Sequence, residues 1–250
     1  MGKFQPGDSR AVLYPQKGKD AATAPAPNKQ FSVKSFAATN RTGSAIDVGL
    51  LRKYPNAKWV FGEFDESAAA GSEVTERTAA AQDTAQAVTL FTTTNDDGFV
   101  VSSRDTFGLV GMTISQIQTG SPVFAFEYFN GTAFTALTLI ETPVFTSTGD
   151  VFLAFLPPHD WVAGGLTDAA VAGQFQIRAT ATTASTQAVL ATELWVAEFF
   201  EFQPNLPNEA TLSISYPEEK PLDLDGGEGL MPYYGTANAN NFVSFIVSVK

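Results

Sequence analysis

The sequence predicts an all-β protein, an antiparallel, jelly-roll-like β-sandwich that carries an extended N-terminal arm. Three observations predict this fold. The chain has 250 residues and is 44% hydrophobic, which is enough for a substantial core. Its 21 Phe residues often alternate with Thr, Val and Ala, a composition suited to the half-buried face of a sheet. Turn signals rich in Asn, Asp, Gly and Pro separate the alternating runs.

Residues 1–30 form the predicted arm. They include Pro6, Gly7, Pro15 and Gly18, and they end in the run AATAPAPNK, which has no hydrophobic periodicity. X-Pro steps favour extended backbone. A segment this poor in apolar residues buries too little surface to offset its own conformational entropy, so we expect it to become ordered on a partner surface.

The net charge of −11 is distributed unevenly along the chain. Residues 1–60 carry ten basic and three acidic side chains, a balance of +7, so the remainder carries −18. This asymmetry favours a basic arm that docks on an acidic partner, such as a neighbouring copy, and an acidic body that repels nucleic acid. Alternatively, the basic side chains only solvate a loop-rich segment. The residues expected at the interface are Lys3, Arg10, Lys17, Lys19, Lys29 and Lys34.

Residues 31–66 are expected to form short strands that pack on the body or on a neighbour. The runs FSVKSF and KWVFGEF each fit a short strand, whereas the run AIDVGLLRKY between them leaves its type open. Residues 67–86 are rich in Ala, Thr and Glu but also contain a glycine and several threonines. They are predicted to be mostly loop, with one or two helical turns.

The sandwich itself is predicted over residues 67–203. Between the alternating runs AVTLF and FVVSS, residues 95–98 have turn chemistry, which we favour over a metal loop built on their two carboxylates. Asn130-Gly131, between FAFEYF and TAFTAL, is the strongest hairpin signal and predicts a two-residue turn. Pro157-Pro158 should end the strand VFLAFL, because neither proline can donate to a ladder.

Residues 204–250 are predicted to form a C-terminal β segment that completes the body or an interface. The run TLSISY and the final NFVSFIVSVK alternate, and the last run has one fully apolar face that needs a cover. Just before this segment, Glu198 and Glu201 flank two phenylalanines. Such a mixture of faces favours a strand at a subunit interface or a sheet edge protected by charge.

Groups suited to catalysis or metal binding are few. His159, the only histidine, lies beside Asp160, but no nucleophile-elbow motif accompanies them. Asp223, Asp225 and Glu228 have an oxygen-rich spacing that resembles part of a calcium loop, although a solvated acidic turn is favoured because the bidentate Glu of an EF-hand is missing. The sequence also lacks Cys and the phosphate-loop, dinucleotide and zinc-protease motifs. We therefore expect no enzymatic activity, no cofactor and no metal.

The sequence predicts neither export nor membrane insertion. No window approaches the roughly 20 apolar residues of a membrane span, and the N-terminal MGKFQPGDSR lacks the apolar region of a signal peptide. For the same reason the two N-glycosylation patterns, at Asn40 and Asn130, carry little weight. No basic-aromatic motif for nucleic acid is present either.

Five stretches of the chain carry a family resemblance: TERTAAAQDTAQAVTLF, DGFVVSSRDTFGLVGMTIS, FEYFNGTAFTAL, GDVFLAFLPPHDWV and GQFQIRAT. Together they resemble a β-sandwich module that recurs in head, tail and baseplate proteins of tailed bacteriophages, over about residues 75–200. Phe129 and Phe134 stand where the module usually has Trp, which keeps aromatic packing. The resemblance implies that Asp160 and Trp161 are turn and packing residues, and that the protein becomes part of a virion assembled in the host cytoplasm.

The resemblance and the charge layout together predict a non-enzymatic structural protein of a phage virion. We favour a capsid decoration (cement) protein, a homo-oligomer whose arm clamps the major capsid protein or other virion proteins by many weak contacts. A tail, neck or baseplate component is the alternative within this class. An alternative of another class is a carbohydrate-binding module for host attachment, with Tyr128, Phe129 or Trp161 stacked on sugar, although core or hairpin packing is favoured for these aromatics.

Overall fold

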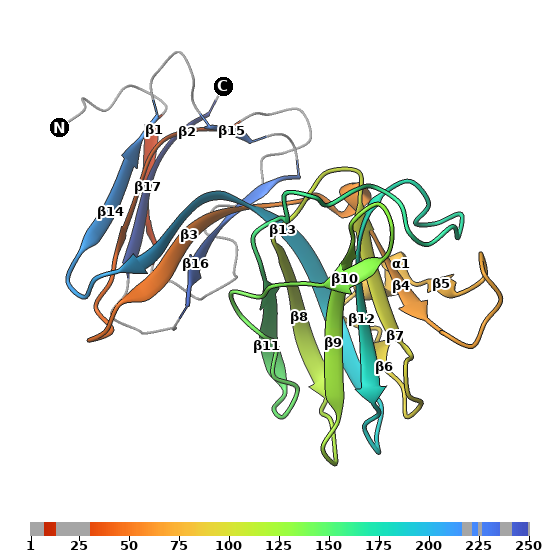
Figure 1. Ribbon diagram of the computed structural model, residues 1–250. Coiled ribbons are helices and arrows are strands. Elements are labelled where there is room, and N and C mark those ends of the chain that lie inside the picture. The colour runs from red at the N-terminus through yellow and green to blue at the C-terminus, as the bar shows by residue number, and fades with distance from the viewer. Residues whose placement is uncertain (1–7, 14–30, 217–221, 225–226, 236–241, 250) are drawn as a thin grey trace. The chain divides into compact units, whose positions relative to one another are not determined.

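The computed structural model describes residues 8–13, 31–216, 222–224, 227–235 and 242–249 (Figure 1). Their regular secondary structure is almost entirely β-strand, and the strands pair antiparallel. The described residues hold one short α-helix, α1 (Thr78–Ala81), and one 3-10 turn (Asn56–Lys58). The predicted all-β class is confirmed.

The chain divides into two compact units. Asn56–Ala197 forms the first, called here the sandwich unit. Met1–Pro55 and Glu198–Lys250, the two ends of the chain, together form the second, called the terminal unit. The predicted boundaries at residues 31–66, 67–203 and 204–250 follow the order of the sequence, whereas the terminal unit combines segments from both ends.

The sandwich unit contains two antiparallel sheets. The first has the strand order β10-β9-β12-β7-β4-β5, with bounds β4 (Trp59–Phe64), β5 (Val74–Glu76), β7 (Gly98–Ser103), β9 (Val123–Phe129), β10 (Phe134–Ala136) and β12 (Phe175–Thr183). The second comprises β6 (Val88–Phe91), β8 (Leu109–Gln116), β11 (Gly149–Ala154) and the first half of β13 (Val189–Leu206), which pairs with both β6 and β8; residues 198–206 of β13 belong to the terminal unit. Figure 1 shows β9, β12 and β7 side by side, and β8 beside β11.

Alternating aromatic residues hold these two sheets together. The ring of Phe91, on β6, lies 5.5 Å from that of Phe99 on β7 and 4.2 Å from that of Phe124 on β9, between ring centroids. On β12, Ile177, Ala179 and Ala181 are all fully buried, as period-two alternation requires of an inward face. The predicted β-sandwich is confirmed by this arrangement.

The turns lie where the sequence predicts them, with one difference in register. β9 and β10 form the expected hairpin, but Phe129 pairs with Phe134, so the loop has four residues rather than two. The Asn130 side chain explains the longer loop, because its carbonyl oxygen accepts hydrogen bonds from the backbone N–H groups of Thr132 and Ala133, both at 3.0 Å. Asp96, in the predicted turn before β7, adopts a left-handed conformation with φ +68°.

The terminal unit is built from strands of both chain ends. One sheet has the order β1-β17-β2-β14, and β15 also pairs with β2; its strands are β1 (Asp8–Leu13), β2 (Phe31–Thr39), β14 (Thr211–Ser215), β15 (Leu222–Leu224) and β17 (Phe242–Val249). In addition β3 (Ile46–Lys53) pairs with β13 on one side and β16 (Gly229–Tyr234) on the other. Within the predicted arm, the described part is β1, and the rest lies outside the described residues.

A buried cluster forms the core of the terminal unit, with the members Phe36, Ala38, Ile46, Val48, Leu50, Leu206, Leu224, Leu230 and Tyr234. Tyr234 is the polar exception. Its hydroxyl is buried and has no hydrogen-bond partner among the described residues. Burial therefore raises the pKa of Tyr234 above its ordinary value.

Tyr234→Phe is expected to stabilise the protein by about 1 kcal/mol, because an unpartnered buried hydroxyl is removed while the ring packing stays. The raised pKa also predicts alkaline lability. In the unfolded chain this hydroxyl has a pKa of about 10. The stability that depends on the neutral Tyr234 hydroxyl is therefore complete below a pH of about 10 and is lost as pH rises above that value. Urea unfolding followed by far-UV circular dichroism at neutral and alkaline pH checks both points. A variant with an unchanged midpoint and an unchanged alkaline loss would contradict this prediction.

Candidate functional sites

The corner after β11 is fixed by one tryptophan. Residues 157–161, PPHDW, follow the strand, which ends at Ala154 as the prolines predict. Trp161 is only 7% exposed. Its ring packs edge-on against those of Phe107, Phe155 and Phe175, at 5.1, 5.9 and 5.5 Å between centroids. Trp161 is therefore a packing residue and cannot stack on a sugar.

A pocket of about 270 Å³ lies beside this corner. We call it the corner pocket; its lining residues are Tyr128, Ala136, Thr138, Leu156, Pro158, His159 and Asp160. The Tyr128 hydroxyl donates a hydrogen bond of 2.9 Å to Oδ1 of Asp160, and this bond raises the pKa of Tyr128 above its ordinary value. His159 Nδ1 lies 4.0 Å from the same oxygen, and the His159 side chain is 99% exposed. The corner thus has one carboxylate, Asp160, that Tyr128 holds by a hydrogen bond, and one imidazole, His159, that is exposed to solvent.

A second polar site lies on the outward face of β9 and β12. Arg178 Nη2 lies 2.7 Å from Glu127 Oε2, Nη1 lies 3.7 Å from Glu66 Oε2, and the guanidinium carbon lies 4.2 Å from the centroid of the Phe134 ring. These contacts join a charge-assisted hydrogen bond to a cation–π interaction. A pocket of about 240 Å³ adjoins Arg178 and is lined also by Glu66, Asp96, Ala125, Glu127, Thr180 and Thr182. Its three carboxylates outnumber its single cation.

The loop before β12 is held to the sheet by one buried amide. Gln176 is fully buried, and its Nε2 donates to the carbonyl oxygens of Leu166 and Val171, at 3.1 and 2.8 Å. Its Oε1 accepts a hydrogen bond of 2.8 Å from the backbone N–H of Leu166. Leu166 and Val171 in turn pack with Phe64 and Val100 in a buried cluster. The loop of residues 166–171 therefore covers the outward face of the sheet.

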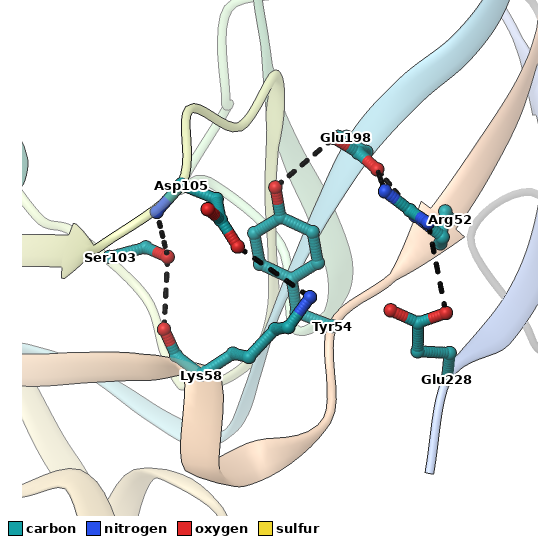
Figure 2. Close-up of polar contacts among 7 residues, drawn as sticks. All are labelled: Arg52, Tyr54, Lys58, Ser103, Asp105, Glu198 and Glu228. Carbon is teal, nitrogen blue, oxygen red and sulfur yellow. Dashed lines mark hydrogen bonds and ion pairs between the residues drawn. The ribbon is translucent and has the colours of Figure 1, made fainter. Parts of the chain in front are cut away.

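An ionic network surrounds Arg52 in the terminal unit (Figure 2). Arg52 pairs directly with Glu198, and its Nη1 lies 3.9 Å from Oε2 of Glu228, whose side chain is only 2% exposed. The Tyr54 hydroxyl donates a 3.2 Å hydrogen bond to the other oxygen of Glu198. Burial alone would lower the pKa of Arg52, but the two carboxylates outweigh it and raise the pKa.

Figure 2 also shows a polar cluster of the sandwich unit. The Ser103 hydroxyl donates to the backbone oxygen of Lys58 at 2.9 Å and accepts a 3.2 Å hydrogen bond from the backbone N–H of Asp105. Lys58 Nζ and Asp105 Oδ2 lie 3.5 Å apart, and both side chains are more than one third exposed. This ion pair is a surface contact of small energetic weight, and the cluster anchors the loop that follows β7.

Arg52→Met should destabilise the terminal unit by about 2 kcal/mol, because it removes the cation that pairs with Glu198 and lies beside the buried carboxylate of Glu228. Glu198, whose side chain is 23% exposed, contributes less to this loss than the buried Glu228, since water partly screens it. Urea unfolding monitored by circular dichroism measures the effect. Lys58→Met, which breaks a surface ion pair of the sandwich unit, is the matched control and should cost less than about 1 kcal/mol. Equal losses in the two variants would contradict the prediction.

Of the three residues with calcium-like spacing, one has a described environment. Glu228 is buried and faces Arg52. Asp223 lies in β15, and Asp225 falls outside the described residues. Over the part of the chain that the structure describes, no three or more His, Cys, Asp or Glu side chains come together as a metal site would require. The sequence does not predict the ion pair between Arg52 and Glu228, because these two residues are 176 positions apart.

Most of the predicted interface residues lie outside the described ranges, namely Lys3, Lys17, Lys19 and Lys29. Arg10 lies in β1 and Lys34 in β2. Among the described residues no helix is both long and apolar enough to cross a membrane. Phe129, one of the aromatics considered for sugar stacking, is partly buried and packs at 5.7 Å on Phe134 across the hairpin.

The formal charge of the chain is carried by one unit. The sandwich unit holds four basic and fifteen acidic side chains, a net charge of −11, whereas the terminal unit holds eleven of each. Within the terminal unit the charge is again divided by sequence, because residues 1–55 hold nine basic and three acidic side chains. A basic segment and an acidic unit are thus combined in one chain.

No family model, no curated protein and no solved structure matches this chain. The resemblance to the phage virion module stays a prediction, carried by the five stretches given above.

Proposed function

We propose that this protein is a non-enzymatic structural component of a tailed-phage virion, and specifically a capsid decoration protein. The observation that carries the proposal is the charge layout. The sandwich unit has a net charge of −11, while the first 55 residues have an excess of six basic side chains. A protein that occurs in many neighbouring copies can use both features, since the basic segment of one copy complements an acidic surface of the next.

The resemblance supports the virion assignment. Its stretches span about residues 75–200, which is close to the range of the sandwich unit, Asn56–Ala197. The motifs that carry it have structural roles there: Asn130 closes the β9–β10 hairpin, and Trp161 packs the corner after β11. A rigid sandwich with its motifs used for packing suits a building block better than a catalyst, although fold alone does not set function.

The mechanism we propose is multivalent attachment. A single exposed ion pair contributes only about 0–1 kcal/mol, so one basic side chain cannot hold a copy in place. Several such contacts, on a segment tethered to a folded body, act together through high effective concentration. Attachment should therefore weaken as salt rises, because salt screens exposed charges.

The test is attachment to purified expanded heads of the phage that encodes the chain. Deleting residues 2–28 should abolish attachment while the sandwich unit stays folded. This deletion also removes β1, so a second variant keeps that strand and combines Lys17→Gln, Lys19→Gln and Lys29→Gln. Its occupancy on heads should fall, and its dependence on salt should lessen.

A matched variant combines Lys58→Gln, Arg77→Gln and Arg104→Gln, which removes the same number of charges from the sandwich unit. It should attach like the unmodified protein. Full occupancy of the deletion variant would overturn the arm mechanism. A chain that is absent from purified virions would overturn the virion assignment itself.

A further inference from the structure

We propose that the corner pocket binds a single neutral saccharide residue. This site is independent of the attachment mechanism above, and none of its lining residues belongs to the basic segment. Three features of the corner pocket suit it to such a ligand: its size, the division of its lining into apolar and polar parts, and the rigidity of the corner.

The size of the pocket selects a small ligand. Its volume of about 270 Å³ lies just below the range of about 300–1,000 Å³ that is usual for drug-sized ligands. One sugar ring fits such a volume, whereas a long oligosaccharide would extend into solvent. The pocket is therefore suited to a terminal residue or a monosaccharide.

One part of the pocket is apolar. Ala136, Leu156 and Pro158 contribute it, and Leu156 keeps 50% of its surface exposed, although it is a large aliphatic residue. Covering that surface with the C–H face of a sugar ring would remove apolar area from water. The structure thus offers a platform for the less polar face of the ligand.

The other part of the pocket consists of hydrogen-bonding groups. Asp160 supplies a carboxylate, which only accepts hydrogen bonds and so favours a ligand with several O–H donors. The Tyr128 hydroxyl fixes one oxygen of that carboxylate at 2.9 Å. Thr138 and His159 add groups that both donate and accept. Adjacent hydroxyls of a sugar match such a set.

The corner is rigid, which lowers the entropic cost of binding. Asp160 directly precedes Trp161, whose ring is buried among Phe107, Phe155 and Phe175. Tyr128 is itself only 8% exposed, so its hydroxyl is presented from a packed ring. The carboxylate therefore stands in a defined position before a ligand arrives.

Charge restricts the ligand to neutral sugars. The lining contains one carboxylate and neither Lys nor Arg, and the sandwich unit as a whole carries −11. Sialic acid and uronic acids would be repelled. The competing ligand is a cationic group, such as the side chain of an arginine in another molecule, because the Asp160 carboxylate would attract it.

The test is a titration of the full chain, labelled with ¹⁵N, by NMR. The probes are glucose, galactose, mannose and N-acetylglucosamine, with N-acetylneuraminic acid and arginine amide as charged comparisons. At least one neutral sugar should give saturable shifts confined to the corner pocket, with a Kd of about 1 mM. Asp160→Asn replaces the charged acceptor with a neutral amide that keeps one acceptor oxygen, and Thr138→Val removes a hydroxyl, so each should weaken binding about tenfold.

Tyr216→Phe is the matched control, because it removes a tyrosine hydroxyl that contacts Glu201 in the terminal unit. It should leave the sugar affinity unchanged. Thr138 is exposed and outside the core, so its variant stays informative if Asp160→Asn alters the corner. No shifts at about 50 mM sugar, well above the expected Kd, would overturn the proposal. Stronger binding of arginine amide or N-acetylneuraminic acid than of every neutral sugar would also overturn it.

Discussion

Gly98→Ala is expected to destabilise the sandwich unit by about 3 kcal/mol or more. Gly98 begins β7 and pairs with Thr180 of β12 and with Phe64 of β4. A Cβ at this position would lie 1.8 Å from the carbonyl oxygen of Ala179 and 2.8 Å from its carbonyl carbon. Because both contacts are to backbone, relief requires the central ladders of the sheet to separate.

Urea unfolding followed by tryptophan fluorescence measures this effect directly. All three tryptophans, Trp59, Trp161 and Trp195, belong to the sandwich unit, so the signal reports on that unit alone. Gly173→Asn is the control: its added side chain meets open space, and Asn tolerates the left-handed φ of +68° at that position. It should change stability by less than about 0.5 kcal/mol. A Gly98→Ala protein that unfolds at the original urea concentration would refute the argument.

Gln176→Leu should cost about 3–4 kcal/mol, the second large effect we expect. Leucine keeps most of the side-chain volume but removes three hydrogen bonds to the backbone of residues 166–171. Each backbone group left buried without a partner costs about 1–3 kcal/mol, and partial exposure of the loop to water relieves part of this. The loop that covers the sheet should therefore loosen as the unit loses stability.

Two measurements separate these consequences. Tryptophan fluorescence in urea gives the loss of stability, and amide hydrogen exchange locates the loosening in residues 166–172. Gln174→Leu is the matched control, because Gln174 is only partly buried and makes two side-chain hydrogen bonds, one to the oxygen of Ala170 and one from Ser102. Its expected cost is about 1 kcal/mol. If amide hydrogen exchange in residues 166–172 of Gln176→Leu stays unchanged, Gln176 does not hold this loop on the sheet.

Local patterns explain why the sandwich unit could be predicted well. Alternation in FQIRATATT places Ile177 and Ala179 on one face and Gln176 and Arg178 on the other, and the structure has this arrangement. The hairpin at Asn130 and the strand end before Pro157 depend on neighbouring residues only, so the sequence predicts both positions. The prediction of a two-residue turn in this hairpin was wrong, because the Asn130 side chain accepts hydrogen bonds from its own loop and the loop has four residues.

The candidate sites depend on pairs that are distant along the chain. Tyr128 and Asp160 form the corner pocket from the first sheet and from the turn after β11. Arg52 lies in β3 and Glu228 directly before β16, so the two residues come from distant parts of the sequence. Local sequence patterns point to Tyr128, Asp160 and Glu228 separately, but they carry no signal that Gln176 holds a loop by hydrogen bonds or that Arg178 lies on the Phe134 ring.

The all-β class, the alternation of the sheet faces, the positions of turns and the basic character of the first residues can all be read from the amino-acid sequence. These properties follow from period-two patterning, turn chemistry and composition, which are local. The pairing of β3 with β13 and β16, the approach of Arg52 to Glu228 and the hydrogen bond from Tyr128 to Asp160 become visible only in the folded protein. Such contacts are set by which hydrophobic faces bury one another, and a local pattern does not specify the partner.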